Sequence, residues 1–202
     1  MEITGENISE VWEKTVASLL KNGKYCIYNT RRVLEIDNVL LSINKLDNEE
    51  ISRKFIYNST FLKLHSNLFL QDNSNNRTYK RIYKYGKYEY NQVNKVIQNL
   101  IQNPKTKDAI ILAGNPEEDM FSNVSSPCLI YMHFYISDYK LCLNASMKIT
   151  DVWLDLLPDI FQNVTLLKMI ASEIKLPIGQ YNHYVSNAFI YYNDLCLVKK
   201  IF

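Results

Sequence analysis

The stretch from Cys128 to Met147 is rich in aliphatic and aromatic residues and is interrupted by the turn sequence Ser137-Asp138-Tyr139. This composition predicts two strands joined at that turn. Residues 129–135 are apolar at nearly every position, which is typical of a strand whose two faces are both buried. The 15 tyrosines of the chain also suit strands better than a helical bundle. The sequence therefore favours a sheet covered by other elements.

Helical periodicity and turn residues predict the elements around these strands. A first helix begins at Asn7, where Glu10 completes a capping box, or at Ser9, and ends at Gly23. A long helix carries Pro158 in its first turn. The remaining expectations are a strand over 33–43, a helix within 51–70, a loop over 72–76, a helix over 91–103, a strand over 109–113 and a final strand over 181–192. Long helices on a mostly mixed sheet define an α/β or α+β chain.

Length and charge restrict the class of protein. The 202 residues suffice for one core, so we expect residues 1–202 to form a single domain. A net charge of +2 is too small to indicate a nucleic-acid or membrane surface. No secretory signal and no membrane-spanning run is visible, so a cytoplasmic location with reduced cysteines is expected.

A cysteine nucleophile is the main chemical candidate. The three histidines lie far apart in the sequence, and no metal site is expected. Cys128 follows Pro127 at the junction of a polar loop and an apolar strand, where a thiol faces either a cleft or the core. Nearby cations would favour the reactive thiolate. The candidate cations are Arg31, Arg32, Lys107 and Lys148, and the competing interpretation is a buried thiol with solvated surface charges.

A series of short segments follows in a fixed order between residues 79 and 194. The segments are Tyr79-Lys-Arg-Ile82, Asn91-Gln92, Asn103-Pro-Lys-Thr-Lys107, Ser126-Pro-Cys128, Ser146-Met-Lys148, Thr150-Asp-Val-Trp-Leu154, Leu157-Pro158, Leu176-Pro-Ile-Gly179 and Phe189-Ile-Tyr-Tyr-Asn193. This series resembles the thymidylate synthase family, which includes the pyrimidine nucleotide hydroxymethylases, although no single motif is intact. The resemblance implies a three-layer fold with a large twisted mixed sheet and a long core helix.

The resemblance also implies roles for the cysteine and the cations. Cys128 would add as a thiolate to C6 of a pyrimidine. Lys148 matches an arginine that keeps this thiol ionised, and Arg31 or Arg32 matches a phosphate-binding arginine. Lys107 matches the first of two arginines that reach across the interface of a homodimer. The phosphate site would therefore be completed by a second copy of the chain.

Further residues match family positions less closely. Asp151 matches an aspartate that contacts folate, Tyr79 an active-site tyrosine and Tyr191 a tyrosine that contacts the nucleotide sugar. Asp159 falls, after a one-residue shift, where the family reads the pyrimidine base. The family's catalytic glutamate has no carboxylate counterpart, and His65 aligns with it.

Three interpretations follow from these matches. In the first, a homodimer transfers a hydroxymethyl or methylene group from 5,10-methylenetetrahydrofolate to C5 of a pyrimidine nucleotide. In the second, a repurposed member acts on a non-nucleotide unsaturated substrate in specialised metabolism. In the third, the protein is a non-catalytic binding or assembly subunit. The chain is short for the family, which predicts an open or partner-completed site.

Overall fold

A mixed β-sheet forms the centre of the computed structural model, which describes residues 1–46, 51–71, 77–121 and 126–202. Within these residues the sheet has seven strands in the order β1-β3-β7-β6-β5-β4, and β2 pairs with β3 beside this path. The strands are β1 (Glu2–Gly5), β2 (Lys24–Tyr28), β3 (Arg31–Ile43), β4 (Ile110–Leu112), β5 (Leu129–Ser137), β6 (Lys140–Asp151) and β7 (Ile178–Tyr191). The pairs β1–β3 and β6–β7 are parallel and the others are antiparallel.

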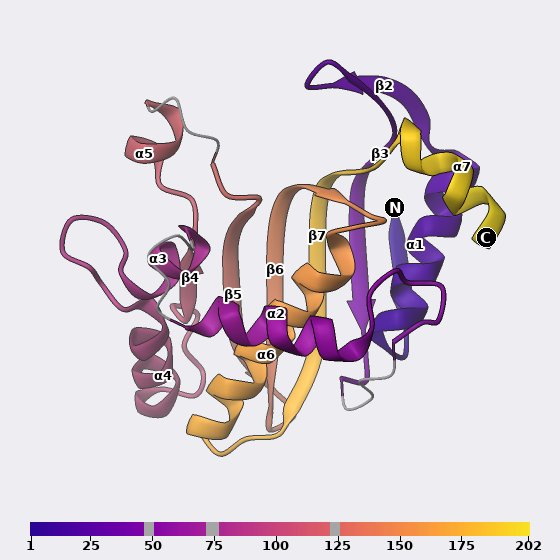
Figure 1. Cartoon of the computed structure of the whole chain (residues 1–202). Helices are drawn as coiled ribbons and strands as arrows, with labels where there is room; N and C mark the ends of the chain where they lie inside the picture. The colour runs from indigo at the N-terminus through magenta and orange to yellow at the C-terminus, as the bar shows by residue number, and fades with distance from the viewer. Residues whose placement is uncertain (47–50, 72–76, 122–125) are drawn as a thin grey trace.

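Helices complete a three-layer arrangement (Figure 1). The long helix α6 lies along the sheet, and α2 crosses over α6 on the side away from the sheet. The helices of the described residues are α1 (Ile8–Asn22), α2 (Ser59–Leu70), α3 (Arg77–Tyr83), α4 (Gln92–Gln102), α5 (Pro116–Met120), α6 (Leu156–Glu173) and α7 (Tyr192–Ile201). The expected mixed α/β fold with a long core helix is confirmed.

Burial alternates along the central strands, as expected of strands with one face on the core. On β7, Tyr181, His183 and Val185 are buried, while the residues between them are half-buried. These buried positions pair in register with Leu41 and Ala145 and their neighbours on β3 and β6. The buried face of the central strands therefore lies beneath α6, whose apolar side chains close the core.

Local sequence signals account for the elements that were predicted correctly. The side chain of Asn7 accepts a hydrogen bond from the backbone of Glu10 at 2.9 Å, and α1 ends at Gly23. Asp138 and Tyr139 both have positive φ, as a two-residue type I′ hairpin turn requires. The expected helices at 91–103 and after Pro158, and the strands at 33–43 and 109–113, are also present.

Two expectations require correction. The helix within 51–70 begins only at Ser59, because the Asn58 side chain accepts a hydrogen bond from the backbone of Phe61 at 2.9 Å and caps the helix there. The final strand ends at Tyr191 and is followed by α7. Only two side chains of α7, Leu195 and Val198, are buried, so its hydrophobic periodicity was too weak to predict a helix. The loop expected over 72–76 lies outside the described residues.

No helix among the described residues combines the length and the apolar character that crossing a membrane requires.

Candidate active site

Cys128 lies directly before β5 and is exposed to solvent. Its carbonyl oxygen accepts a hydrogen bond from the backbone N–H of Lys148 on β6 at 2.9 Å. The Lys148 ammonium group donates to the carbonyl oxygen of Ser126 at 3.0 Å and also to the Ser126 hydroxyl. The lysine predicted to accompany the thiol is therefore held beside the segment that carries Cys128.

Two aspartates at the start of α6 act electrostatically on the same thiol. Asp155 is the residue before α6, and Asp159 lies one helical turn further on. The hydroxyl of Thr150, two residues after Lys148 on β6, donates to the Asp159 carboxyl at 3.3 Å. Burial, together with the charge of Asp155, raises the pKa of Asp159 to about 8 despite this hydrogen bond. Asp159 is therefore mostly protonated at neutral pH.

The protonation state of Cys128 differs from the expectation. Partial burial raises the pKa of the thiol, and the charges of Asp159 and Asp155 raise it further. Lys148 lowers the pKa but does not reverse the direction. Lys148 lies beside the segment that carries Cys128, as expected, but burial and the two carboxyl groups outweigh its effect on the pKa of the thiol. The resting thiol is protonated.

Asp151 is the last residue of β6, and only one of its two carboxyl oxygens accepts hydrogen bonds among the described residues. One oxygen accepts hydrogen bonds from the backbone N–H groups of Trp153 at 2.9 Å and Leu154 at 3.2 Å. The other oxygen is buried and has no partner among the described residues. Burial raises the pKa of Asp151 to about 7, against the effect of these two hydrogen bonds. A buried oxygen without a partner is a suitable contact for a ligand N–H group.

Arg31 and Arg32 form a small basic pocket with aromatic walls. The pocket has a volume of about 180 Å³ and is lined by Arg31, Arg32, Tyr191, Tyr192 and Asn193. The guanidinium carbon of Arg31 lies 3.9 Å from the centroid of Tyr191, and that of Arg32 lies 4.7 Å from the centroid of Tyr192. Stacking of this kind fixes the plane of a guanidinium and orients its donors.

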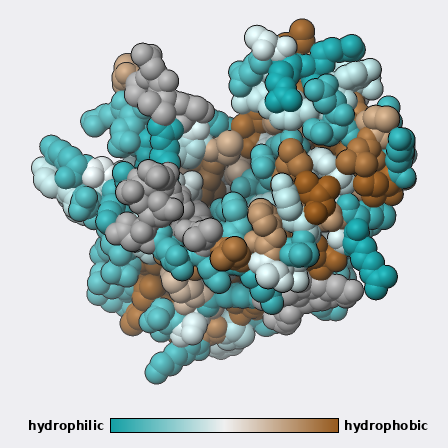
Figure 2. All heavy atoms as spheres, viewed as in Figure 1, coloured by the Kyte–Doolittle hydropathy of each residue, from teal (hydrophilic) through white to brown (hydrophobic). Residues whose placement is uncertain are grey.

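The basic pocket and the thiol lie at the same end of the sheet. Phe189, two residues before Tyr191, pairs with Asp151 across β7 and β6. Figure 1 shows the β2–β3 hairpin, the ends of β6 and β7 and the start of β5 at this end. Figure 2 shows the surface hollowed here, between the hairpin and the region of α5. The structure thus brings together the predicted residues Cys128, Lys148, Asp159, Asp151, Arg31, Arg32 and Tyr191.

The two remaining predicted residues have other contacts within the described part of the chain. Lys107 precedes β4 and helps to lower the pKa of His133, which is lowered mainly by burial. His133 is five residues beyond Cys128 on β5, so Lys107 lies away from the thiol. Tyr79 stacks on Tyr83 within α3, with ring centroids 4.6 Å apart.

The sequence prediction missed Asp155 and Thr150. The spacing of Asp155 and Asp159 at positions i and i+4 before a helical stripe was a usable signal, since it places both on one face of the helix. Among the described residues, no group of three or more His, Cys, Asp or Glu side chains could hold a metal ion.

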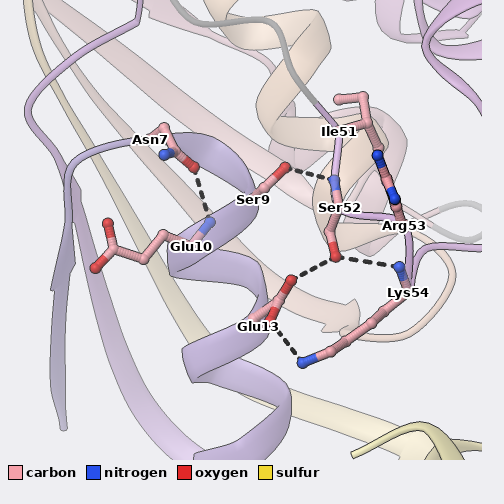
Figure 3. A pocket seen from close by; sticks show the side chains of 8 residues that line it. All are labelled: Asn7, Ser9, Glu10, Glu13, Ile51, Ser52, Arg53 and Lys54. Carbon is pink, nitrogen blue, oxygen red and sulfur yellow. Dashed lines mark hydrogen bonds and ion pairs between the residues drawn. The ribbon is translucent and has the colours of Figure 1, made fainter.

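A larger pocket, of about 520 Å³, lies between α1 and residues 51–54 (Figure 3). Its polar groups bond to one another: Ser9 accepts from the backbone of Ser52 at 2.8 Å, and Lys54 pairs with Glu13 at 2.7 Å. Because these side chains use one another as hydrogen-bond and ion-pair partners, we interpret the pocket as packing between two segments and not as a reactive centre.

The fold and the site define an α/β protein with a solvent-accessible cysteine beside a cation and two carboxyl groups. The chain belongs to the thymidylate synthase family, whose sequence model, described as "Thymidylate synthase", matches residues 10–202. It is 28% identical over 109 residues to a thymidylate synthase from Oenococcus oeni, covering 54% of this chain and 34% of that protein. It is 31% identical over 108 residues to a thymidylate synthase from Mycoplasma genitalium, covering 54% and 37%. The matched segment thus spans about a third of the length of these relatives.

Proposed function

We propose that the protein adds Cys128 to C6 of a pyrimidine nucleotide and transfers a hydroxymethyl or methylene group to C5. The observation that carries this proposal is the convergence of Cys128, Lys148 and Asp159 from three different elements. A nucleophile needs an adjacent polar group that accepts charge as the sulfur bonds to carbon. Membership of the thymidylate synthase family supports pyrimidine as the substrate class.

Asp159 suits the polar edge of the base. A protonated carboxyl group presents one donor and one acceptor, which matches the adjacent carbonyl or amine and ring nitrogen of a pyrimidine. The rise in its pKa to about 8 supports this state at neutral pH. Asp159 therefore serves as the base-reading residue in this proposal.

The basic pocket suits the phosphate and the sugar. Arg31 and Arg32 present guanidinium groups, which bind phosphate with two parallel hydrogen bonds. Tyr191 forms the wall of the pocket next to the sheet and is placed to contact the sugar. In this proposal the nucleotide extends from the pocket, which holds its phosphate, to the thiol, which contacts its base.

The donor set also fits a folate cofactor. When bound, 5,10-methylenetetrahydrofolate supplies the one-carbon unit. The buried oxygen of Asp151 that has no partner among the described residues would accept a hydrogen bond from an N–H group of the cofactor ring. Tyr79 is assigned to the same active site from its motif, as a residue that contacts the reacting groups from α3.

A homodimer explains the position of Lys107. Tyr131 and His133 occupy the face of β5 opposite the buried Phe134, and Tyr131 is 40% exposed. In this proposal a second copy covers that face, and Lys107 beside His133 reaches the phosphate of the partner's nucleotide. Light scattering after size exclusion tests the homodimer, and the molecular mass of a monomer would contradict it.

A cytoplasmic location, where nucleotides and reduced thiols occur together, belongs to the same proposal.

A thermal-shift series tests the substrate class. With dUMP, dCMP or CMP at about a hundred times its Kd, we expect a rise in melting temperature of roughly 5–10 °C. The matching nucleosides should shift it less, because they lack the phosphate. Mass spectrometry of the denatured complex should show a nucleotide adduct that Cys128→Ser lacks. If no nucleotide stabilises the protein at millimolar concentration, the nucleotide proposal fails.

One observation favours a second candidate, a repurposed family member acting on a non-nucleotide unsaturated substrate. Phe189 is buried where a residue contacting the sugar is expected, so the sugar loses a polar partner. Stabilisation by small conjugated carbonyl compounds without any response to nucleotides would identify this candidate. Full activity in Cys128→Ser would exclude covalent catalysis through this cysteine for both candidates.

A further inference from the structure

Among the described residues β4 is an edge strand of the sheet, and α4 lies beside it (Figure 1). On either side of β4, Ala109 accepts from a backbone N–H of β5 at 2.9 Å and Ala113 donates to a β5 carbonyl at 2.9 Å. Because hydrogen-bonded and non-hydrogen-bonded pairs alternate along an antiparallel ladder, the N–H and C=O groups of Ile110 and Leu112 point away from β5. Another strand would pair with groups of this kind.

The Gln92 side chain of α4 shows how an amide group binds this edge. Its Oε1 atom accepts from the backbone N–H of Leu112 at 2.9 Å, and its Nε2 atom donates to the Leu112 carbonyl oxygen at 2.7 Å. The same Nε2 atom donates to the carbonyl oxygen of Arg81 at 2.7 Å, which fixes the plane of the amide. Further along α4, Asn99 donates to the carbonyl oxygen of Asp108 at 3.1 Å. One planar carboxamide therefore satisfies both outward groups of one edge residue.

Ile110 lies between these two capped positions. Neither of its outward backbone groups has a hydrogen-bond partner among the described residues. A pocket of about 460 Å³ opens beside Ile110, between the edge strand, the start of α4 and the turn before α4. Tyr90, which lines the pocket, is 61% exposed, and Lys95 brings a positive charge. The pocket thus combines an amide-binding backbone position with an aromatic ring and a cation.

We propose that this pocket is a binding site for an aromatic carboxamide. The carbonyl oxygen of the ligand accepts from the N–H of Ile110 and its amide nitrogen donates to the Ile110 carbonyl oxygen, as Gln92 does at Leu112. The aromatic ring of the ligand packs on Tyr90, and Lys95 favours an anionic substituent on that ring.

This site is separate from the cysteine. Ile110 pairs with His133, which lies five residues and roughly 16 Å along β5 from Cys128. The proposal therefore adds a second site and does not depend on the substrate of the first.

Benzamide tests the site, because it joins a primary carboxamide to a single aromatic ring. In protein with isotope-labelled isoleucine, the backbone amide proton of Ile110 should shift downfield as benzamide is added. Saturation is expected in the millimolar range, as for other ligands of this size. N,N-Dimethylbenzamide keeps the ring and the carbonyl oxygen but has no N–H group, so it should bind at least fivefold more weakly.

Ile110→Pro removes the backbone donor. Proline is tolerated on an edge strand where its nitrogen points outward, so the pairing of β4 with β5 is retained. The variant also lacks the amide signal, which assigns it in the parent. Its affinity for benzamide, measured from the NMR signals of the ligand, should be at least fivefold lower.

Tyr90→Ala removes the aromatic wall and should weaken binding at least threefold. Tyr139→Ala, at a tyrosine that is 86% exposed on the turn between β5 and β6, is the matched control and should leave the affinity unchanged. Melting curves confirm that each variant is folded.

Three results would overturn the assignment. Shifts confined to isoleucines other than Ile110 would place benzamide elsewhere, and equal affinities of Ile110→Pro and the parent would exclude the amide contact. Displacement of benzamide by dUMP would mean that it binds in the cleft of Cys128. None of the supporting measurements needs a nucleotide, so failure of the nucleotide proposal would leave this site untouched.

Discussion

Trp12 on α1 donates its indole N–H to the backbone oxygen of Val152 at 2.7 Å, although the two residues are 140 positions apart. Val152 follows Asp151 directly, so this bond ties the first helix to the turn on which the Asp151 carboxyl is held. The Trp12 ring also stacks on Trp153 at 5.6 Å between centroids. The geometry at the end of β6 therefore depends on a helix far away in the sequence.

Trp12→Phe should lower the free energy of unfolding by about 3 kcal/mol. The substitution leaves the buried carbonyl of Val152 without a donor, at a cost of about 1–3 kcal/mol, and also opens a small cavity. Urea unfolding followed by circular dichroism measures the change. Tyr139→Phe, at a tyrosine that is 86% exposed, is the control and should change stability by less than about 0.5 kcal/mol.

Asp151 should make the protein less stable as the pH rises from about 4 to about 7. Its pKa is near 4 in an unfolded chain and about 7 in the folded protein, so the folded state binds more protons within this window. The free energy of unfolding therefore falls with rising pH there and levels off above about 7. At about 1.4 kcal/mol per pKa unit, the full effect is about 4 kcal/mol.

Asp151→Asn should remove this dependence, because the amide oxygen still accepts from Trp153 and Leu154 but carries no charge. The variant should match the parent near pH 4 and exceed its stability by up to about 4 kcal/mol at pH 8. Comparing variant and parent at each pH cancels the contributions of other groups. A constant difference between pH 4 and pH 8 would mean that Asp151 ionises as an exposed acid does.

Arg31→Lys should weaken binding of a nucleoside monophosphate about tenfold and leave binding of the nucleoside unchanged. Lysine keeps the positive charge but loses the planar group that stacks on Tyr191 and binds phosphate with two parallel bonds. Titration calorimetry with both ligands separates the two effects. Arg53→Lys, in the pocket of Figure 3, is the control. Equal losses for nucleotide and nucleoside would place Arg31 away from the phosphate.

Gly179→Ala should destabilise the fold by about 1–3 kcal/mol, as overpacking does. A Cβ atom at this position would lie 2.5 Å from the Cys142 sulfur and 3.0 Å from Cβ of Lys140. Gly114→Ala is a matched control, since its nearest contact would be 3.9 Å away. Thermal melts of both variants measure the difference, and equal melting temperatures would show that β6 shifts without cost.

Elements stabilised by neighbouring residues could be predicted from the sequence. Asn7 caps its own helix, and Asp138 and Tyr139 form their own turn, so the pattern and the structure agree there. The neighbourhood of Cys128 and Lys148 was expected from two separate family-like segments, and the pairing of β5 with β6 brings these segments together.

Contacts between distant segments could not be predicted in this way. The His65–Gln162 contact joins residues 97 positions apart and exists only because α2 crosses α6. The pKa of Cys128 depends on burial and on the two α6 acids, so its direction followed from packing and not from the local charges that the sequence displays.

The protonated state of Cys128 has a consequence for the lifetime of the protein. Oxidation by peroxide and exchange with disulfides both proceed through the thiolate. Because partial burial, and after it the charges of Asp159 and Asp155, raise the pKa of Cys128, we expect this cysteine to react slowly with oxidants although solvent reaches it. The surroundings of the sulfur thus disfavour sulfenic acid formation while no substrate is bound.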